Sequence, residues 1–316
     1  MNTSTRAYRV PDDYTVVDRF LVELYEPADR LAHWLQPRWE YMHSHPYVEN
    51  VDLQRIGIAA DDDAVVGVVH PEHSPAFCYF QIRPGRSDVK MMLVEWAEAH
   101  LGGWSSDLKG TVVGFFIDDI DVESQTILTQ RGYSTFSDWG EHHARMRLDV
   151  PLPRTSMQEG FRLQSLADEN DLAKVNRVLR RGFGHEGPAP EDGISSRARA
   201  QQTPNYHKEL NIVAVAPDGS YAAYAGIWYI PENKVAYVEP VATDPDYRRM
   251  GLGKAVVLEA ILRTRELGAE VAWVGSEQEF YLDMGFEVVA HSTLWYRDLD
   301  AARSGRMVDH ALGLAE

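Results

Sequence analysis

A short stretch in the last third of the chain joins two glycines to three basic side chains. Arg248-Arg249-Met250-Gly251-Leu252-Gly253-Lys254 follows the turn Asp244-Pro245-Asp246-Tyr247 and opens an apolar-periodic run that stops at Gly268. Glycines spaced by one residue let the backbone approach a ligand closely. The start of a helix leaves N–H groups without partners and carries the positive end of its dipole. The stretch therefore predicts a site for a phosphate or pyrophosphate.

A second motif lies downstream. Phe280-Tyr281-Leu282-Asp283-Met284-Gly285-Phe286 places a tyrosine four residues before a Gly-Phe pair. Together the two motifs resemble the acyl-CoA-binding signature of the GNAT superfamily of N-acyltransferases, which reads Gln/Arg-x-x-Gly-x-Gly/Ala and then Tyr-x-x-x-Gly-Phe. Two motifs in the right order are more specific than one glycine loop. The resemblance spans roughly residues 161–297 and implies acetyl-CoA as the acyl donor.

The resemblance also implies which residues hold that donor. The backbone of Val241 to Thr243 would pair with the pantetheine arm like an added strand, and the N–H groups from Arg249 to Lys254 would surround the pyrophosphate. Ser276 stands near the position at which many members carry an asparagine that contacts CoA. The expected donor-binding residues are Val241, Ala242, Thr243, Arg248, Arg249, Met250, Gly251, Leu252, Gly253, Lys254 and Ser276. The alternative is that Gly251 and Gly253 only form a turn into a helix.

Two residues are the catalytic candidates. Tyr281 is the expected general acid, because a phenol is protonated at neutral pH and can donate to a leaving thiolate. Glu239 is the expected general base, acting directly or through water if burial raises its pKa. Pro240 directly after it removes a ladder N–H and favours a strand bulge. The alternatives are a tyrosine that only packs in the core and a carboxylate that binds a cationic substrate or an arginine.

Candidates for the acceptor pocket are less specific. His185 and Glu186 lie in the glycine- and proline-rich loop Gly182–Gly193, where the resemblance places the acceptor. Aromatic residues on strands are candidates for the pocket wall: Tyr224, Trp228 and Tyr296. The alternatives are solvated loop residues for the first pair and core packing for the aromatic ones.

Composition excludes several other classes. The net charge of −17 argues against nucleic acid, whose phosphates require clustered Lys and Arg. The single cysteine, Cys78, cannot form an internal disulfide and fits a reducing compartment. No apolar run is long enough to span a bilayer and the first ten residues lack a signal core, so we expect a cytoplasmic protein without a membrane partner. The histidine pairs lack the closed ligand set that a metal site requires, so no metal is expected.

The order of predicted elements repeats along the chain. Each half shows helices, three strands, a helix, a strand, a helix and closing strands, which predicts an α+β fold of two tandem GNAT-like domains. Each domain is expected to hold a mixed, mostly antiparallel sheet flanked by helices. The predicted boundaries are 1–150, a linker at 151–157, 158–300 and a tail at 301–316. Each domain is expected to close with a pair of short strands, at Tyr133–Trp139 and Ala144–Leu148 and at Phe286–Ala290 and Thr293–Arg297.

The first copy lacks the chemistry of the second. It has no Gly-x-Gly after Pro84, Leu128 stands at the position of Tyr281, and Cys78 stands at that of Glu239. We therefore expect a degenerate first copy and an acetyl-CoA-dependent N-acetyltransferase in the second, acting directly on a primary amine of a small molecule. The alternatives are a non-catalytic CoA-binding sensor and an enzyme, similar in layout to mycothiol synthase, that acetylates a sugar-linked cysteine. Neither the acceptor nor the oligomeric state can be read from the residues.

Overall fold

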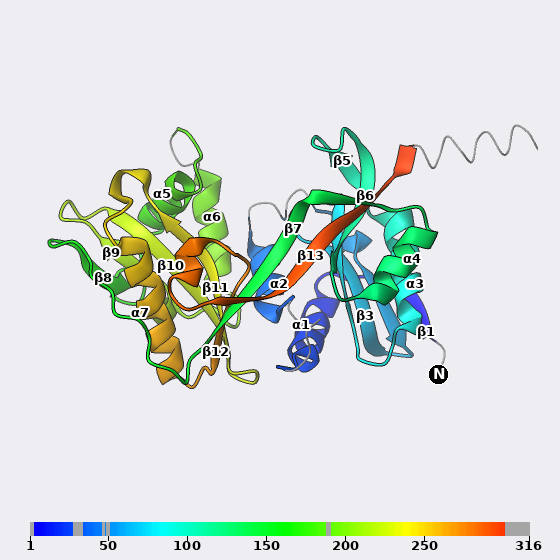
Figure 1. Cartoon of the computed structure of the whole chain (residues 1–316), viewed down its shortest axis with the longest axis horizontal. Helices are drawn as coiled ribbons and strands as arrows, with labels where there is room; N and C mark the ends of the chain where they lie inside the picture. Colours follow the sequence, from blue (N-terminus) through cyan, green and yellow to red (C-terminus); the bar gives the residue numbers. More distant parts are fainter. Residues whose placement is uncertain (1–2, 28–33, 46–47, 49–50, 188–190, 301–316) are drawn as a thin grey trace, which may run out of the picture. The chain divides into compact units, whose positions relative to one another are not determined.

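The computed structural model describes residues 3–27, 34–45, 48, 51–187 and 191–300. These residues form two units (Figure 1). The first contains the described parts of Met1–Trp34, Tyr47–Glu141 and Ala290–Glu316, and the second those of Leu35–Pro46 and His142–Val289. The predicted tail, 301–316, lies outside the described residues, as do residues 188–190 of the predicted glycine-rich loop.

The first unit is built mainly from the N-terminal half of the chain. Its helices are α1 (Asp12–Leu24), α3 (Asp88–His100) and α4 (Val122–Gln130), with the short 3-10 helix η2 (Leu53–Arg55). Its strands are β1 (Thr3–Ala7), β2 (Gly57–Asp61), β3 (Ala64–Pro71), β4 (Phe77–Ile82), β5 (Gly103–Ser105), β6 (Gly110–Asp118) and the larger parts of β7 (Ser134–Arg147) and β13 (Glu287–Asp298). The short strands β1 and β5 had no counterpart in the sequence prediction.

The second unit contains the motif-bearing segments. Its helices are α2 (Gln36–Ser44), α5 (Leu172–Gly182), α6 (Glu191–Ala200), α7 (Leu252–Glu266) and α8 (Glu279–Leu282), with the 3-10 turns η3 (Lys208–Leu210) and η4 (Pro245–Tyr247). Its strands are β8 (Arg162–Ser165), β9 (Ile212–Val215), β10 (Tyr221–Ile230), β11 (Val235–Thr243), β12 (Val271–Val274) and the end of β7 (Ser134–Arg147).

The strands of the two units follow the same pairing order. In the first unit, β1, β2, β3 and β4 pair antiparallel in succession, and β4 then pairs with β6 in parallel. In the second, β8, β9, β10 and β11 pair antiparallel in succession, and β11 then pairs with β12 in parallel. This repetition, with helices on the sheets, confirms the predicted α+β class of two tandem domains with mixed, mostly antiparallel sheets.

Each sheet is completed by a strand from the other half of the chain. Residues 144–147 of β7 pair antiparallel with β12 of the second unit, and residues 292–298 of β13 pair antiparallel with β6 of the first. The two predicted pairs of short closing strands are therefore wrong, since each pair is one continuous strand. The prediction divided these two strands near Gly140 and near His291. The strands continue there because ladder hydrogen bonds come from the backbone, so polar side chains do not interrupt them.

The core of the second unit lies on both faces of its sheet. On β10, Ala223, Ala225 and Ile227 face the apolar side of α7, while Tyr224 packs with residues of α5. Every residue of β10 is buried, as expected for a central strand covered on two sides. The sheet thus fixes β11, which carries the catalytic candidate Glu239, between two packed helices.

A buried carboxylate holds the start of α1 in the first unit. Asp13 is 1% exposed and accepts hydrogen bonds from Arg6 at 2.6 and 2.9 Å and from the Arg9 backbone N–H at 2.7 Å. Burial opposes ionisation of Asp13, but the hydrogen bonds from Arg6 and Arg9 outweigh it and lower its pKa from 3.8 to about 2.

We expect Asp13→Asn to reduce the free energy of unfolding by about 2 kcal/mol at pH 7, because the shift in pKa is linked to stability. Since the folded-state pKa is depressed, this contribution is complete above the unfolded pKa and disappears as the pH falls through the folded pKa. Urea unfolding of both proteins at a series of pH values measures the difference. Asp12→Asn, which alters an exposed neighbour, should change stability by less than about 0.5 kcal/mol. A difference for Asp13→Asn that persists undiminished toward pH 2 would contradict this account.

Candidate active site

The central feature of the second unit is a strand edge that opens part-way along β11. β11 pairs in parallel with β12 only from Val235 to Tyr237. It continues to Thr243, with Val241, Ala242 and Thr243 paired to β10 on the opposite edge. Within the described residues, no strand covers the β12-facing edge of these three. An uncovered edge offers N–H and C=O groups to an extended ligand, as in strand addition.

A bulge marks the position at which β11 leaves β12. Ala225 pairs with Val241 and Ile227 with Val238, so β11 holds one extra residue there, at Glu239-Pro240. The predicted bulge at Pro240 is therefore confirmed. The Glu239 carbonyl accepts a hydrogen bond from Trp228 Nε1 at 3.0 Å. A Cβ on Gly226 would lie 2.8 Å from that same carbonyl, which explains the glycine opposite the bulge.

The glycine-containing loop leads directly into α7. Gly251 is the N-cap residue with φ 76°, and Arg249 also has a positive φ of 63°. A left-handed residue followed by helical ones turns successive N–H groups toward one point, which is the geometry of an anion-binding nest. The first intrahelical bond runs from the Ala255 N–H to the Gly251 carbonyl, leaving the preceding N–H groups available.

Close contacts leave no room for a side chain at Gly251 or Gly253. A Cβ on Gly251 would lie 2.3 Å from the Ser156 carbonyl oxygen, and one on Gly253 would lie 2.9 Å from Thr243 Oγ1. The loop thus packs against Ser156 on one side and against Thr243, at the end of β11, on the other. Leu252 anchors the helix start in the core and Met250 packs at its border. These contacts fix the direction of the N–H groups before any ligand arrives.

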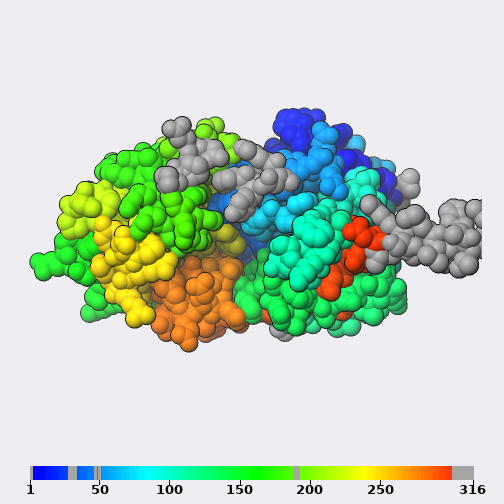
Figure 2. All heavy atoms as spheres, turned by 90° about the horizontal axis from the view of Figure 1, so that it is seen from above, coloured from blue at the N-terminus to red at the C-terminus, as the bar shows by residue number. Residues whose placement is uncertain are grey.

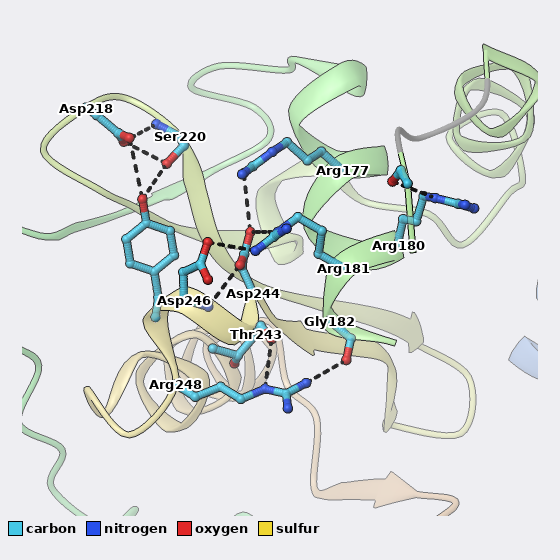
Figure 3. Close-up of polar contacts among 12 residues, drawn as sticks. Arg177, Arg180, Arg181, Gly182, Asp218, Ser220, Thr243, Asp244, Asp246 and Arg248 are labelled. Carbon is cyan, nitrogen blue, oxygen red and sulfur yellow. Dashed lines mark hydrogen bonds and ion pairs between the residues drawn. The ribbon is translucent and has the colours of Figure 1, made fainter. Parts of the chain in front are cut away.

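The basic side chains of the loop contact backbone carbonyls. Arg248 donates to the carbonyl of Gly182 at 3.0 Å and to that of Thr243 at 3.5 Å (Figure 3). Lys254 donates to the carbonyl of Asp283 at 3.3 Å. Their positive charges therefore remain beside the α7 N-terminus while the side chains tie the loop to α5 and to the α8 segment.

A buried carboxylate, which the sequence analysis did not single out, fixes the entrance to this loop. Asp244 is fully buried and accepts from Arg181 Nε at 2.7 Å, while Arg177 lies 3.3 Å from the same oxygen (Figure 3). Its other oxygen accepts from the Asp246 backbone N–H at 3.1 Å. Burial opposes ionisation, but the hydrogen bonds and the two arginine charges prevail and lower the Asp244 pKa. The end of α5 is thereby bound to the turn that begins the loop.

Tyr281 lies in the core of the same unit. Its ring contacts Phe280 and Phe286 at centroid distances of 4.9 and 5.8 Å, and the residue is 8% exposed. Burial, and secondly the negative charge of Glu239, raise the pKa of its hydroxyl above the ordinary value. Its segment (orange) lies beside α7 (yellow) in Figure 2, and Phe280 contacts the Gly253 position. The structure thus brings together the tyrosine, the glutamate and the loop.

Of the remaining predicted residues, some lie at the surface. Ser276 follows β12 and accepts a hydrogen bond from the Gln278 N–H at 3.2 Å. His185 and Glu186 are exposed, and the carbonyl of Glu186 accepts a hydrogen bond from Arg180. No described contact connects these three to Tyr281 or Glu239, so their roles stay predictions.

The predicted aromatic residues separate into two groups. Tyr224 and Trp228 lie together with Tyr206, whose ring meets Trp228 at 5.5 Å and whose hydroxyl lies 3.4 Å from that of Tyr224. Tyr296 instead pairs with Gly114 of β6 and belongs to the first unit. Its role in the acceptor pocket stays a prediction.

The corresponding loop of the first unit is built differently. Arg86, between β4 and α3, bonds to Asp61 and to both oxygens of Asp88, at 2.8 and 2.9 Å for the latter. Asp88 also begins α3. A carboxylate therefore occupies the helix start, where the second unit presents N–H groups and cations.

A comparison with known protein families bears on this geometry. The profile of the acetyltransferase (GNAT) family matches residues 178–286, which run from α5 through the loop to the Gly-Phe pair. Residues 178–286 form a GNAT acetyltransferase domain. No curated protein sequence matches the chain.

Solved structures extend the likeness of this GNAT domain to the tandem arrangement. A GCN5-related N-acetyltransferase from Sphaerobacter thermophilus is similar over 94% of this chain and 96% of its own, at 17% identity and a TM-score of 0.62. A tandem GNAT protein from the clavulanic acid biosynthesis pathway is similar over 94% and 99%, at 14% identity and a TM-score of 0.60. An acetyltransferase of the GNAT family from Colwellia psychrerythraea gives 11% identity and a TM-score of 0.56. The recognition of a tandem GNAT fold is therefore confirmed.

The described residues offer neither a metal site nor a membrane-spanning helix. Among the residues that the structure describes, no group of three or more His, Cys, Asp or Glu side chains is arranged to hold a metal ion. Within the same ranges, no helix combines the length and apolar character needed to cross a membrane.

Proposed function

We propose that the second unit is an acetyl-CoA-dependent N-acetyltransferase that acts directly on a primary amine of a small molecule. One observation carries the proposal: the uncovered edge of β11 lies in the same domain as a nest-forming helix start and a buried tyrosine near a glutamate. The family of this domain transfers acetyl groups. The strand edge suits a pantetheine arm, and the helix start suits a pyrophosphate.

The proposed donor site uses backbone groups of β11 and of the loop that leads into α7. Val241, Ala242 and Thr243 would offer backbone groups to the amides of the arm. The N–H groups from Arg249 to Lys254, with the charges of Arg248, Arg249 and Lys254, would bind the two phosphates. A side chain at Gly251 or Gly253 would displace this loop, as the contact distances above require.

The proposed reaction balances with the groups at hand. Bound acetyl-CoA supplies an acetyl thioester, whose C–S bond breaks as a C–N bond forms to the amine. Glu239 takes a proton from the amine, directly or through water, and Tyr281 donates one to the departing sulfur. The raised pKa of Tyr281 keeps its proton in place until it is needed. No nucleophile paired with a base is required, because transfer is direct.

One donor site per chain is proposed, in the second unit. The carboxylate of Asp88 at the corresponding helix start of the first unit would repel a pyrophosphate, and Arg86 is already bonded to Asp61 and Asp88. Calorimetric titration with acetyl-CoA should therefore give a stoichiometry of about one. Failure to bind acetyl-CoA would overturn the proposed function, and two equal sites would overturn the assignment of a single site.

We expect Gly251→Ala to weaken acetyl-CoA binding by about tenfold or more. A non-glycine residue in the left-handed region costs about 1–2 kcal/mol, and the new Cβ also forces the loop away from Ser156. Gly219→Ala is a matched control, because Gly219 has φ 84° in the β9–β10 turn but no atom within 4 Å of its Cβ position. The control should lose similar stability and keep its affinity in the same titration. Equal affinities for the two variants would show that the loop does not bind the donor.

A further inference from the structure

One half-buried arginine of the second unit has a buried guanidinium nitrogen without a hydrogen-bond partner in the described residues. Arg197 lies in the last turn of α6, and its Nε atom is buried with no hydrogen bond within the described residues. No described carboxylate forms an ion pair with it either. Its helical neighbour Arg199 differs, since it donates to Ser196 at 3.0 Å. Buried polar groups are nearly always satisfied, so such a group needs an explanation.

Arg197 lies near the hydroxyls of two tyrosines, Tyr206 and, on β10, Tyr224. Burial raises the pKa of the Tyr206 and Tyr224 hydroxyls, and the positive charge of Arg197 opposes that rise at both. Tyr224 donates a hydrogen bond to Asn211, and Tyr206 forms a bridge to Trp228. The cation therefore lies beside polar hydroxyls and aromatic rings, and within the described residues no anion neutralises it.

This cluster is directly joined to the catalytic segment. Trp228 donates to the carbonyl of Glu239, and Tyr224 pairs with Ala242 on β11. The Asn211 side chain lies 2.9 Å from the Cβ position of Gly226, which also contacts the Glu239 carbonyl. A ligand held by Arg197 would thus lie on the side of β11 covered by α5, next to the bulge.

We propose that the acceptor amine also carries a carboxylate and that Arg197 binds this carboxylate. A planar guanidinium with free donors matches a carboxylate in two parallel hydrogen bonds. The aromatic rings of Tyr206 and Trp228 would contact the apolar part of the acceptor. The proposal rests on the proposed function and assigns its substrate class, amino acids or similar amino-carboxylates, with Arg197 as a specificity-determining residue.

The test compares pairs of acceptors that differ only in whether they carry the negative charge of a carboxylate. Free amino acids and their carboxamides are supplied with acetyl-CoA to the full-length protein, and CoA release gives kcat/KM for each. Calorimetric titration of the corresponding N-acetyl amino acids, with CoA present, measures binding without turnover. We expect kcat/KM for the acids to exceed that for their carboxamides by about 10- to 100-fold, as for a charge-assisted hydrogen bond.

Variants then assign the preference to one side chain. Arg197→Met should reduce the ratio of acid to carboxamide to near one while acetyl-CoA affinity and the thermal midpoint remain close to those of the wild type. Arg197→Lys should retain part of the ratio. Arg199→Met, which removes the same charge from the same helix, should retain all of it.

The failures of the two proposals are distinguishable. If acetyl-CoA does not bind, the proposed function fails. If acetyl-CoA binds but the acids are neither acetylated nor bound, or carboxamides serve equally well, only the inference about the carboxylate is overturned. An unchanged ratio in Arg197→Met would likewise overturn it, and a lower thermal midpoint with an unchanged ratio would assign Arg197 to the fold.

Discussion

Tyr281→Phe is expected to lower kcat by about 10²- to 10⁴-fold, the usual contribution of a positioned general acid. Phenylalanine keeps the ring contacts with Phe280 and Phe286 and removes only the hydroxyl. Acetyl-CoA affinity should stay within about twofold, because the donor is held by the β11 edge and the α7 N-terminus. Steady-state CoA release together with calorimetric titration separates the two quantities.

Tyr229→Phe is a suitable control for the loss of a buried hydroxyl. Tyr229 is 6% exposed, lies in the same α7-side core, and donates to the Leu267 carbonyl at 3.0 Å. Its replacement should cost about 1 kcal/mol of stability and leave kcat nearly unchanged. If Tyr281→Phe retains its activity within about threefold, the proton must come from another group. If affinity falls as much as kcat, the hydroxyl supports the site rather than the reaction.

What the sequence predicted well was local. The loop glycines follow from backbone conformation at adjacent positions, and the structure gives Gly251 the positive φ that such a loop needs. The apolar-periodic run that stops at Gly268 is helix α7, which begins at Leu252 directly after the loop and ends at Glu266. These elements depend on periodicity and turn chemistry within a few residues, which a single sequence contains.

What the sequence did not predict depends on contacts between distant segments. The exchange of β7 and β13 involves pairing partners far along the chain, and no periodicity identifies a partner. Tyr296 was therefore grouped with Tyr224 and Trp228, although it pairs with β6 of the first unit. Asp244 reads as an ordinary turn residue because its partner Arg181 is 63 positions away. Arg197 likewise has no local signal, since the burial of its Nε atom depends on the packing of α6 on α5 and α2.

The buried position of Asp244 leads to the second large prediction. Asp244→Ala should reduce the free energy of unfolding by about 2–3 kcal/mol, since it removes a fully buried carboxylate with charged donors. The cost is below that of a wholly buried pair because the Arg181 side chain is 34% exposed and regains water. Urea or thermal unfolding measures the loss. Because the Asp244 pKa is lowered, the difference in the free energy of unfolding between wild type and variant should be largest at neutral pH. It should decrease as the pH falls below the ordinary range of aspartate pKa values.

Asp246→Ala is the control that distinguishes the effect of burying a carboxylate from the effect of its charge, because Asp246 and Asp244 both bond to Arg181. Asp246 also accepts from Arg181 at 2.7 Å, but its side chain is 69% exposed, so its loss should cost less than about 1 kcal/mol. Asp244 acts as a positioning residue, since it holds the turn that precedes Arg248 and Gly251 against α5. Its replacement should raise the KM for acetyl-CoA while kcat at saturation falls less, and Asp244→Glu should restore part of that KM. If Asp246→Ala destabilises the protein as much as Asp244→Ala, or if only kcat changes, the buried carboxylate does not position the loop.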